Sequence, residues 1–108
     1  MNIGKAIKVL RKQKQLSQEE LARTAGVTQA ALSHIERGKR PGEATLEKIS
    51  AALGVSVSLI YMMSIDETDV PTENADVYQK LFPHIQQLIL GLAKKPEKPI
   101  VSESHSRE

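Results

Sequence analysis

The sequence predicts an all-α protein with five short helices followed by a C-terminal helical segment. Apolar residues recur at steps of three and four, which is the spacing of one helix face. Ser or Thr precedes several of these stretches and Gly follows several, as is typical of helix starts and stops. The length of 108 residues suits one compact domain with an appendage, because two full domains need a longer chain.

The first two helices are indicated by apolar spacing and by a capping signal. The first should end near residues 14–15, and its apolar face is formed by Ile3, Ile7 and Leu10. Ser17 and Glu20 have the spacing of a capping box, which predicts a second helix over residues 18–25. Gly26 then ends this helix, because glycine tolerates the left-handed conformation that often follows a C-terminus.

The next three helices follow the same signals. Thr28 is expected to cap a third helix that ends around Arg37, and a loop follows it. The fourth helix should span residues 44–53, and the fifth should run from its cap, Ser56, to about Met63. The glycines that follow the third and fourth helices are Gly38 and Gly54.

Composition changes after the fifth helix and predicts the organisation of the whole chain. We expect a domain over residues 1–64, an acidic linker over 65–75, a helical segment over 76–95 and a disordered tail over 96–108. Pro83 interrupts the helical segment. It should kink this helix or begin a separate one, because proline lacks the N–H that a helix interior needs.

Charge and composition restrict the classes of function. Residues 1–54 carry ten Lys or Arg against five Asp or Glu, a net charge of +5, while residues 55–108 carry five against eight, a net of −3. A basic first half suits a polyanionic partner. The absence of cysteine excludes disulfides, a thiol nucleophile and a cysteine zinc site, and no apolar run is long enough for a membrane span. We therefore expect a soluble, cytoplasmic protein without a metal or cofactor.

The spacing within residues 18–37 is the most informative feature. Two short helices that cross steeply through a tight turn need a small residue at the crossing, a residue tolerant of positive φ in the turn, and apolar anchors below the second helix. Counting from residue 18, these stand at positions five, nine, fifteen and eighteen, as Ala22, Gly26, Leu32 and Ile35. The spacing predicts a helix-turn-helix, and an ordinary helical hairpin is the alternative.

These residues also carry a family resemblance. The stretch LSQEELARTAGVTQAALSHIERGKRP, followed by TLEKISAALGVS, resembles the Xre family of phage repressor and Cro-like helix-turn-helix domains over residues 3–62. The resemblance implies a five-helix, phage-repressor-like domain with its third helix in the major groove of DNA. It also implies a homodimer on a two-fold-symmetric operator, and it does not extend past residue 64.

The outward side of the third helix contains the candidate base-reading residues. With Leu32 and Ile35 turned inward, the residues expected to read bases are Gln29, Ala30, Ser33 and His34. The Gln29 amide can pair with adenine N6 and N7, and the Ala30 methyl can touch a thymine methyl. Ser33 can bind a base or a phosphate. His34 can donate or accept a hydrogen bond, or it is a solvated surface residue.

A second group is expected to contact phosphate or to support the reading helix: Gln18, Thr28, Arg37, Lys39 and Arg40. Arg37 can grip phosphate or only favour the negative end of its helix. The resemblance implies that the loop with Lys39 and Arg40 follows the DNA backbone, and that Gln18 buttresses Gln29.

The resemblance also implies a structural ion pair. It places an arginine near the end of the first helix against the glutamate of a Glu-x-Gly motif, and in this chain these residues are Arg11 and Glu36. We assign the pair to positioning the third helix, not to DNA contact.

The C-terminal segment has an apolar stripe that must be buried: Val77, Leu81, Ile85, Leu88 and Leu92. It can pack on its own domain or on a second chain, and we favour dimerisation with a second chain. The alternative dimer surface is the fifth helix, with Leu59, Ile60, Met62 and Met63. A segment of some 20 residues can hardly enclose a pocket, so we expect no small-molecule ligand.

Catalysis is not indicated by any motif. The three histidines, His34, His84 and His105, fall in separate segments, and there is no phosphate-binding glycine loop. The sequence therefore predicts a non-enzymatic, dimeric repressor that binds double-stranded operator DNA with an inverted repeat. The alternative is a protein-interaction module on the same scaffold, an antirepressor or scaffold subunit, without DNA specificity of its own.

Overall fold

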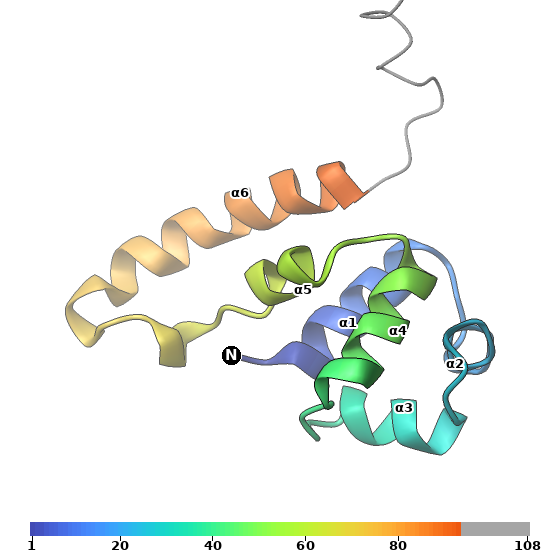
Figure 1. Ribbon diagram of the computed structural model, residues 1–108. Helices are drawn as coiled ribbons and strands as arrows, with labels where there is room; N and C mark the ends of the chain where they lie inside the picture. Colours follow the sequence, from blue (N-terminus) through green and yellow to red (C-terminus); the bar gives the residue numbers. More distant parts are fainter. Residues whose placement is uncertain (94–108) are drawn as a thin grey trace, which may run out of the picture.

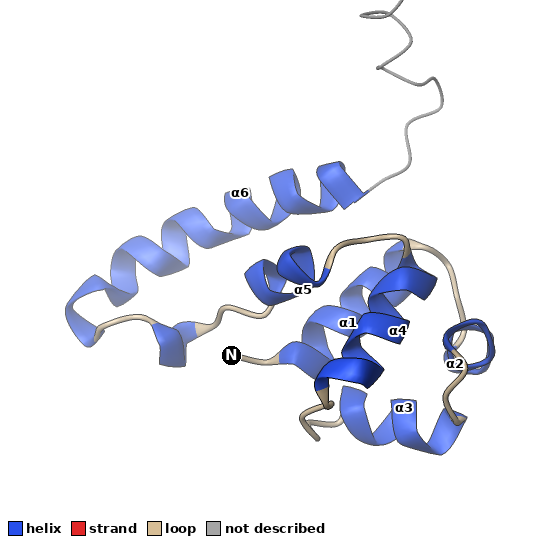
Figure 2. Cartoon of the chain, in the orientation of Figure 1, coloured by secondary structure: helices blue, strands red, loops and turns tan. Residues whose placement is uncertain are grey.

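The computed structural model describes residues 1–93 and is all-helical in that range, as predicted (Figure 1; Figure 2). Its α-helices are α1 (Ile3–Gln13), α2 (Gln18–Ala25), α3 (Gln29–Glu36), α4 (Glu43–Leu53), α5 (Val57–Met63) and α6 (Ala75–Ala93). Two short 3-10 turns, Glu67–Asp69 and Thr72–Asn74, join α5 to α6. The tail expected over residues 96–108, and the last two residues of the segment 76–95, lie outside the described residues.

Local signals account for the helix boundaries. The Ser17 hydroxyl accepts from the Glu20 N–H at 3.0 Å, and the Glu20 carboxylate accepts from the Ser17 N–H at 2.8 Å, so the predicted capping box is confirmed. Gly26 ends α2 with φ of 74°, in the left-handed region that glycine adopts without strain. These two signals define α2 over the predicted residues.

The first five helices enclose one core. Helices α1, α2, α3, α4 and α5 contact one another, and their fully buried apolar side chains are Ile7, Leu10, Leu21, Leu32, Ile49, Leu53 and Ile60. The alternative dimer surface on α5 is wrong in part, because Ile60 and Met63 belong to this core and face inward. Only Met62, of the four residues proposed there, is well exposed.

Helix α6 is continuous and packs on α5 (Figure 1). Pro83 lies inside it, so the expectation that a separate helix begins there is wrong. Phe82, directly before the proline, and Ile89, after it, are both buried, and Ile89 belongs to the core of the domain. The C-terminal segment therefore does pack on its own domain, through residues other than the predicted stripe.

The expected acidic linker is folded. The Asp66 side chain accepts from the Thr68 N–H at 3.0 Å and caps the first 3-10 turn, and the Met1 ammonium pairs with Asp66 at 3.0 Å and with Asp69 at 2.8 Å. Hydrogen bonding to Thr68, followed by the Met1 ammonium, lowers the pKa of Asp66 to about 2. The connection thus lies against the start of α1.

Within residues 1–93, no single helix is long and apolar enough to cross a membrane. Helices α4 and α5 taken together reach the required length and composition, but they meet at a bend of 94°.

Candidate nucleic-acid interface

Helix α3 has one buried side and one free side. Leu32 and Ile35 are buried in the core, as predicted. The residues on the other side are exposed, apart from the half-buried Ser33: Gln29, Ala30, Ser33, His34 and Arg37. In Figure 1 the helix lies at one edge of the domain, away from α6. Polar side chains on this edge can therefore reach a partner without any movement of the described chain.

The start of α3 is held by its cap. The Thr28 hydroxyl accepts a hydrogen bond from the Ala31 N–H at 3.0 Å, which fixes the first turn. Gln29 is the first residue of the helix and projects from this fixed turn. In the turn before it, the Val27 N–H donates to the Ala22 carbonyl at 3.0 Å, which closes the connection from α2.

A buried ion pair anchors the other end of α3. Arg11 Nε donates to Glu36 Oε2 at 2.7 Å and Arg11 Nη2 donates to Glu36 Oε1 at 3.1 Å, while Arg11 Nη1 donates to the Leu16 carbonyl at 2.8 Å. The side chains are only 10% and 3% exposed. The structure brings this predicted pair together, and the hydrogen bonds of Arg11 join α1 to the end of α3 and to the segment before α2.

Gln18 joins the same group. Its Nε2 donates to Glu36 Oε1 at 3.0 Å, so the hydrogen bond found for this amide in residues 1–93 is to Glu36 and not to Gln29. Glu36 is a charged acceptor, which attracts an N–H more strongly than a neutral amide does. The buttress of Gln29 by Gln18 that the resemblance implies stays a prediction for the complex with DNA.

Sequence reasoning missed a glycine that positions α3. A Cβ added to Gly4 would lie 2.0 Å from the Ile35 carbonyl oxygen and 3.2 Å from the Glu36 Cα, so α1 passes the end of α3 backbone against backbone. Only glycine permits this approach. The available signal was a glycine inside an amphipathic helix, which indicates close packing without saying what it packs against.

Cationic residues lie at and after the end of α3. Arg37, Lys39 and Arg40 are all exposed. The Gly38 N–H donates to the Ile35 carbonyl at 3.0 Å, and the Lys39 N–H donates to the His34 carbonyl at 3.0 Å, so the chain leaves α3 in a defined direction. The three charges are thus held beside the C-terminal end of the polar side of α3.

Two short helices joined through a glycine turn, with the second presenting a free polar side flanked by cations, define a helix-turn-helix protein. The helix-turn-helix family model matches residues 7–60 of this chain, which is half of its length. The chain belongs to this family, and within it to the Xre type that the motifs indicated.

Similar proteins carry regulatory names. The chain is 34% identical to the immunity repressor protein of Bacillus phage phi105 over 91% of its own length and 67% of the repressor's. It is 46% identical to the HTH-type transcriptional regulator SinR of Bacillus licheniformis, over 62% of this chain and 61% of SinR. It is 33% identical to the HTH-type transcriptional repressor RghR of Bacillus subtilis strain 168, over 67% of this chain and 58% of RghR. The family is thus one of transcriptional regulators and not of enzymes.

Proposed function

We propose that this chain is a sequence-specific DNA-binding transcriptional regulator, a dimeric repressor that reads an inverted-repeat operator with α3 in the major groove. The observation that carries the proposal is the free polar side of α3, held by fixed caps and flanked by exposed cations. The printed names of the relatives, which include two repressors, support the regulatory role. A protein of this kind acts in the cytoplasm, where bacterial DNA lies.

Each residue on this side has a proposed role in reading bases. Gln29 stands where a recognition helix reaches deepest, and its exposed amide pairs with adenine N6 and N7. Ala30 contacts a thymine methyl and makes no hydrogen bond. Ser33 and His34 follow one turn later and contact base edges farther along the groove.

A further set positions the protein on the DNA backbone: Gln18, Thr28, Arg37, Lys39 and Arg40. Lys39 and Arg40 supply charge beyond the end of α3, and Arg37 supplies it at that end. The Gln18 amide has a second N–H that does not bond to Glu36, and this N–H can donate to a phosphate. Phosphate contacts of this kind fix register and orientation without reading sequence.

We propose that a second copy of this chain covers the stripe on α6. All five stripe residues are between 43% and 77% exposed in the single chain, and an apolar helix face of this extent requires a partner in water. Successive helix residues are about 100° apart, so the stripe is centred roughly a quarter of a turn from the line through Phe82 and Ile89 that faces α5. The stripe thus points sideways from the domain.

The direction of the α6 stripe allows two paired chains to bind one operator. Helices α3 and α6 lie on opposite sides of the domain (Figure 1). Pairing through a lateral stripe keeps both α3 helices on the same side of a two-fold dimer, where they can enter successive major grooves about 34 Å apart. Pairing straight across the far side of α6 would instead point the two reading helices in opposite directions.

The alternative, a protein-interaction module, needs an apolar or acidic reading side. The α3 side is polar and is followed by three exposed cations, so the geometry favours DNA.

Selection of bound duplexes from a random pool, with sedimentation of the selected complex, tests the proposal. We expect an enriched inverted repeat bound by two chains. Binding of selected DNA should weaken as salt rises, because Lys and Arg displace condensed counterions. A pool that yields no common sequence would refute the proposal.

A further inference from the structure

We infer that the packing of α6 on its own domain sets the distance between the two half-sites that the protein accepts. The residues that determine this operator spacing are Tyr78, Gln79, Phe82 and Ile89, which act by positioning and touch no DNA. The inference rests on the proposed dimer, because it concerns how the stripe on α6 is connected to α3.

The buried side of α6 is distinct from the exposed stripe. Ile89 is 3% exposed and belongs to the core cluster of the domain, and Phe82 is 9% exposed. The Phe82 ring stacks on Tyr78, with centroids 4.9 Å apart and planes 18° from parallel. One helix therefore carries two apolar surfaces, of which one is already occupied by α5 and its neighbours.

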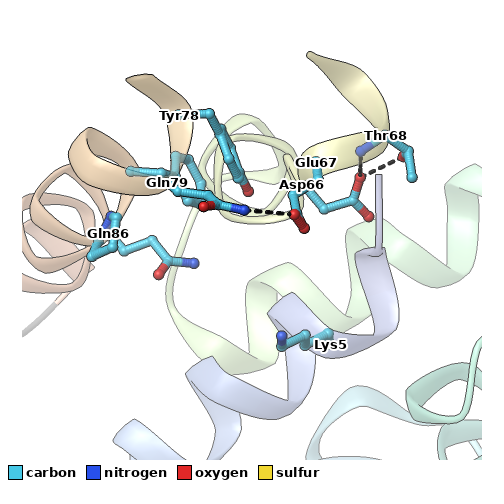
Figure 3. Close-up of a pocket in the computed structure, with 9 residues that line it drawn as sticks. Lys5, Asp66, Glu67, Thr68, Tyr78, Gln79 and Gln86 are labelled. Carbon is cyan, nitrogen blue, oxygen red and sulfur yellow. Dashed lines mark hydrogen bonds between the residues drawn. The ribbon is translucent and has the colours of Figure 1, made fainter. Parts of the chain in front are cut away.

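Polar contacts add a second attachment near the start of α6 (Figure 3). The Tyr78 hydroxyl donates to the Ile65 carbonyl at 3.1 Å, and Gln79 Nε2 donates to Glu67 Oε2 at 3.2 Å. These contacts border an open groove of about 490 Å³ between α1, the first 3-10 turn and α6. Tyr78 and Ile89 are separated by roughly 16 Å along the helix axis. A helix attached at two points so far apart cannot pivot on its domain.

This attachment changes what dimerisation does. If α6 hung on a flexible linker, the two domains would sample many separations and would accept many operator spacings. With α6 fixed to the domain, pairing through the stripe fixes both α3 helices relative to each other. One added base pair moves a half-site by about 3.4 Å and rotates it by about 36°, and a rigid dimer cannot follow that change.

The test is a set of duplexes that carry the two selected half-sites with the spacer shortened or lengthened by one to four base pairs. Affinity is measured by fluorescence anisotropy for three proteins: the unaltered chain, the double variant Tyr78→Ala with Phe82→Ala, and the control Lys80→Ala. The double variant removes the stacked ring pair and the hydrogen bond to Ile65, which leaves Ile89 as the buried contact of α6. Lys80 is exposed on α6 and lies away from both apolar surfaces. Tyr78 and Phe82 do not belong to the core cluster of the domain, so their truncation leaves that cluster in place.

The unaltered chain and Lys80→Ala should lose at least about 10-fold in affinity when the spacer changes by two base pairs, because the second half-site is no longer reached. The double variant should still sediment as a dimer and should vary less than about 3-fold across the same spacers. If that variant loses helix content, the milder pair Tyr78→Phe with Gln79→Ala removes only the two hydrogen bonds and should give an intermediate dependence on spacing.

The outcomes separate the inference from the proposed function. An unaltered dimer that accepts all spacers equally overturns the inference and leaves a dimeric DNA-binding regulator. A well-folded, dimeric double variant with the original spacing preference also overturns it. A chain that binds single half-sites as a monomer would instead refute the proposed dimer.

Discussion

Arg11 and Glu36 form a two-point ion pair that joins the end of α1 to the last residue of α3. The contacts are 2.7 Å from Nε to Oε2 and 3.1 Å from Nη2 to Oε1, and neither side chain is more than 10% exposed. Because Gln18 binds the same carboxylate, Glu36 connects three helices. The orientation of α3 therefore depends on a contact that is buried between these helices.

Removing this carboxylate should destabilise the fold strongly. Glu36→Ala leaves a buried, unpaired guanidinium, which costs about 3–5 kcal/mol. Glu43→Ala is the matched control, since Glu43 is exposed at the start of α4 and contributes at most about 1 kcal/mol to the helix dipole. Urea denaturation of both variants measures the difference. Equal losses of unfolding free energy would contradict the structural role of Glu36.

The close approach of α1 to α3 predicts opposite effects for two glycine substitutions. Gly4→Ala places a methyl group against the Ile35 carbonyl and should cost at least about 1–3 kcal/mol. Gly91→Ala lies in α6 with no atom within 4 Å of the added Cβ, and should stabilise by about 0.5–1 kcal/mol through helix propensity. Thermal melts distinguish the signs. A Gly4→Ala protein as stable as the unaltered chain would show that the helices separate at little cost.

Gln29→Ala and Lys39→Ala should change DNA binding in different ways. Gln29→Ala should remove discrimination at one base pair, at a cost of about 1–3 kcal/mol, because it loses a base-edge contact. Lys39→Ala should weaken all duplexes alike and reduce the salt slope by about one, because it loses a phosphate contact. Titrations against a set of single-base operator variants at two salt concentrations measure both effects. The assigned roles would be wrong if the two variants behaved identically.

Charge on the stripe should separate the two copies. Leu88 is 71% exposed, so Leu88→Glu should leave the folded domain intact and prevent pairing through α6. Gln87→Glu adds the same charge at the preceding residue, which is exposed and lies off the stripe, and should remain dimeric. Sedimentation velocity measures the state of both variants. A Leu88→Glu protein that still forms dimers would place the interface elsewhere.

The parts of the fold that local chemistry determines were predictable from sequence. The capping box at Ser17 and the left-handed glycine at Gly26 define α2, because both signals act within a few residues of the helix ends. The burial of Leu32 and Ile35 was predictable from the helix-turn-helix spacing. The exposed side of α3 then followed, because it consists of the other residues of the helix.

Contacts between distant segments were not predictable in the same way. Nothing local to Gly4 indicates the Ile35 carbonyl 31 residues later. Periodicity indicated one apolar stripe on the C-terminal segment, but the packing of α6 on its own domain buries Phe82 and Ile89 and leaves that stripe exposed. The Gln18 amide illustrates the same limit, since its partner depends on where the end of α3 brings Glu36.

The most direct measurement is an anisotropy competition between the selected operator and a scrambled duplex of equal length and composition, at about 150 mM salt. Reading of base edges by α3 predicts that the operator binds at least about 10³-fold more tightly than the scrambled duplex. Equal affinity for the two duplexes at every salt concentration would contradict the assignment of α3 as a reading helix.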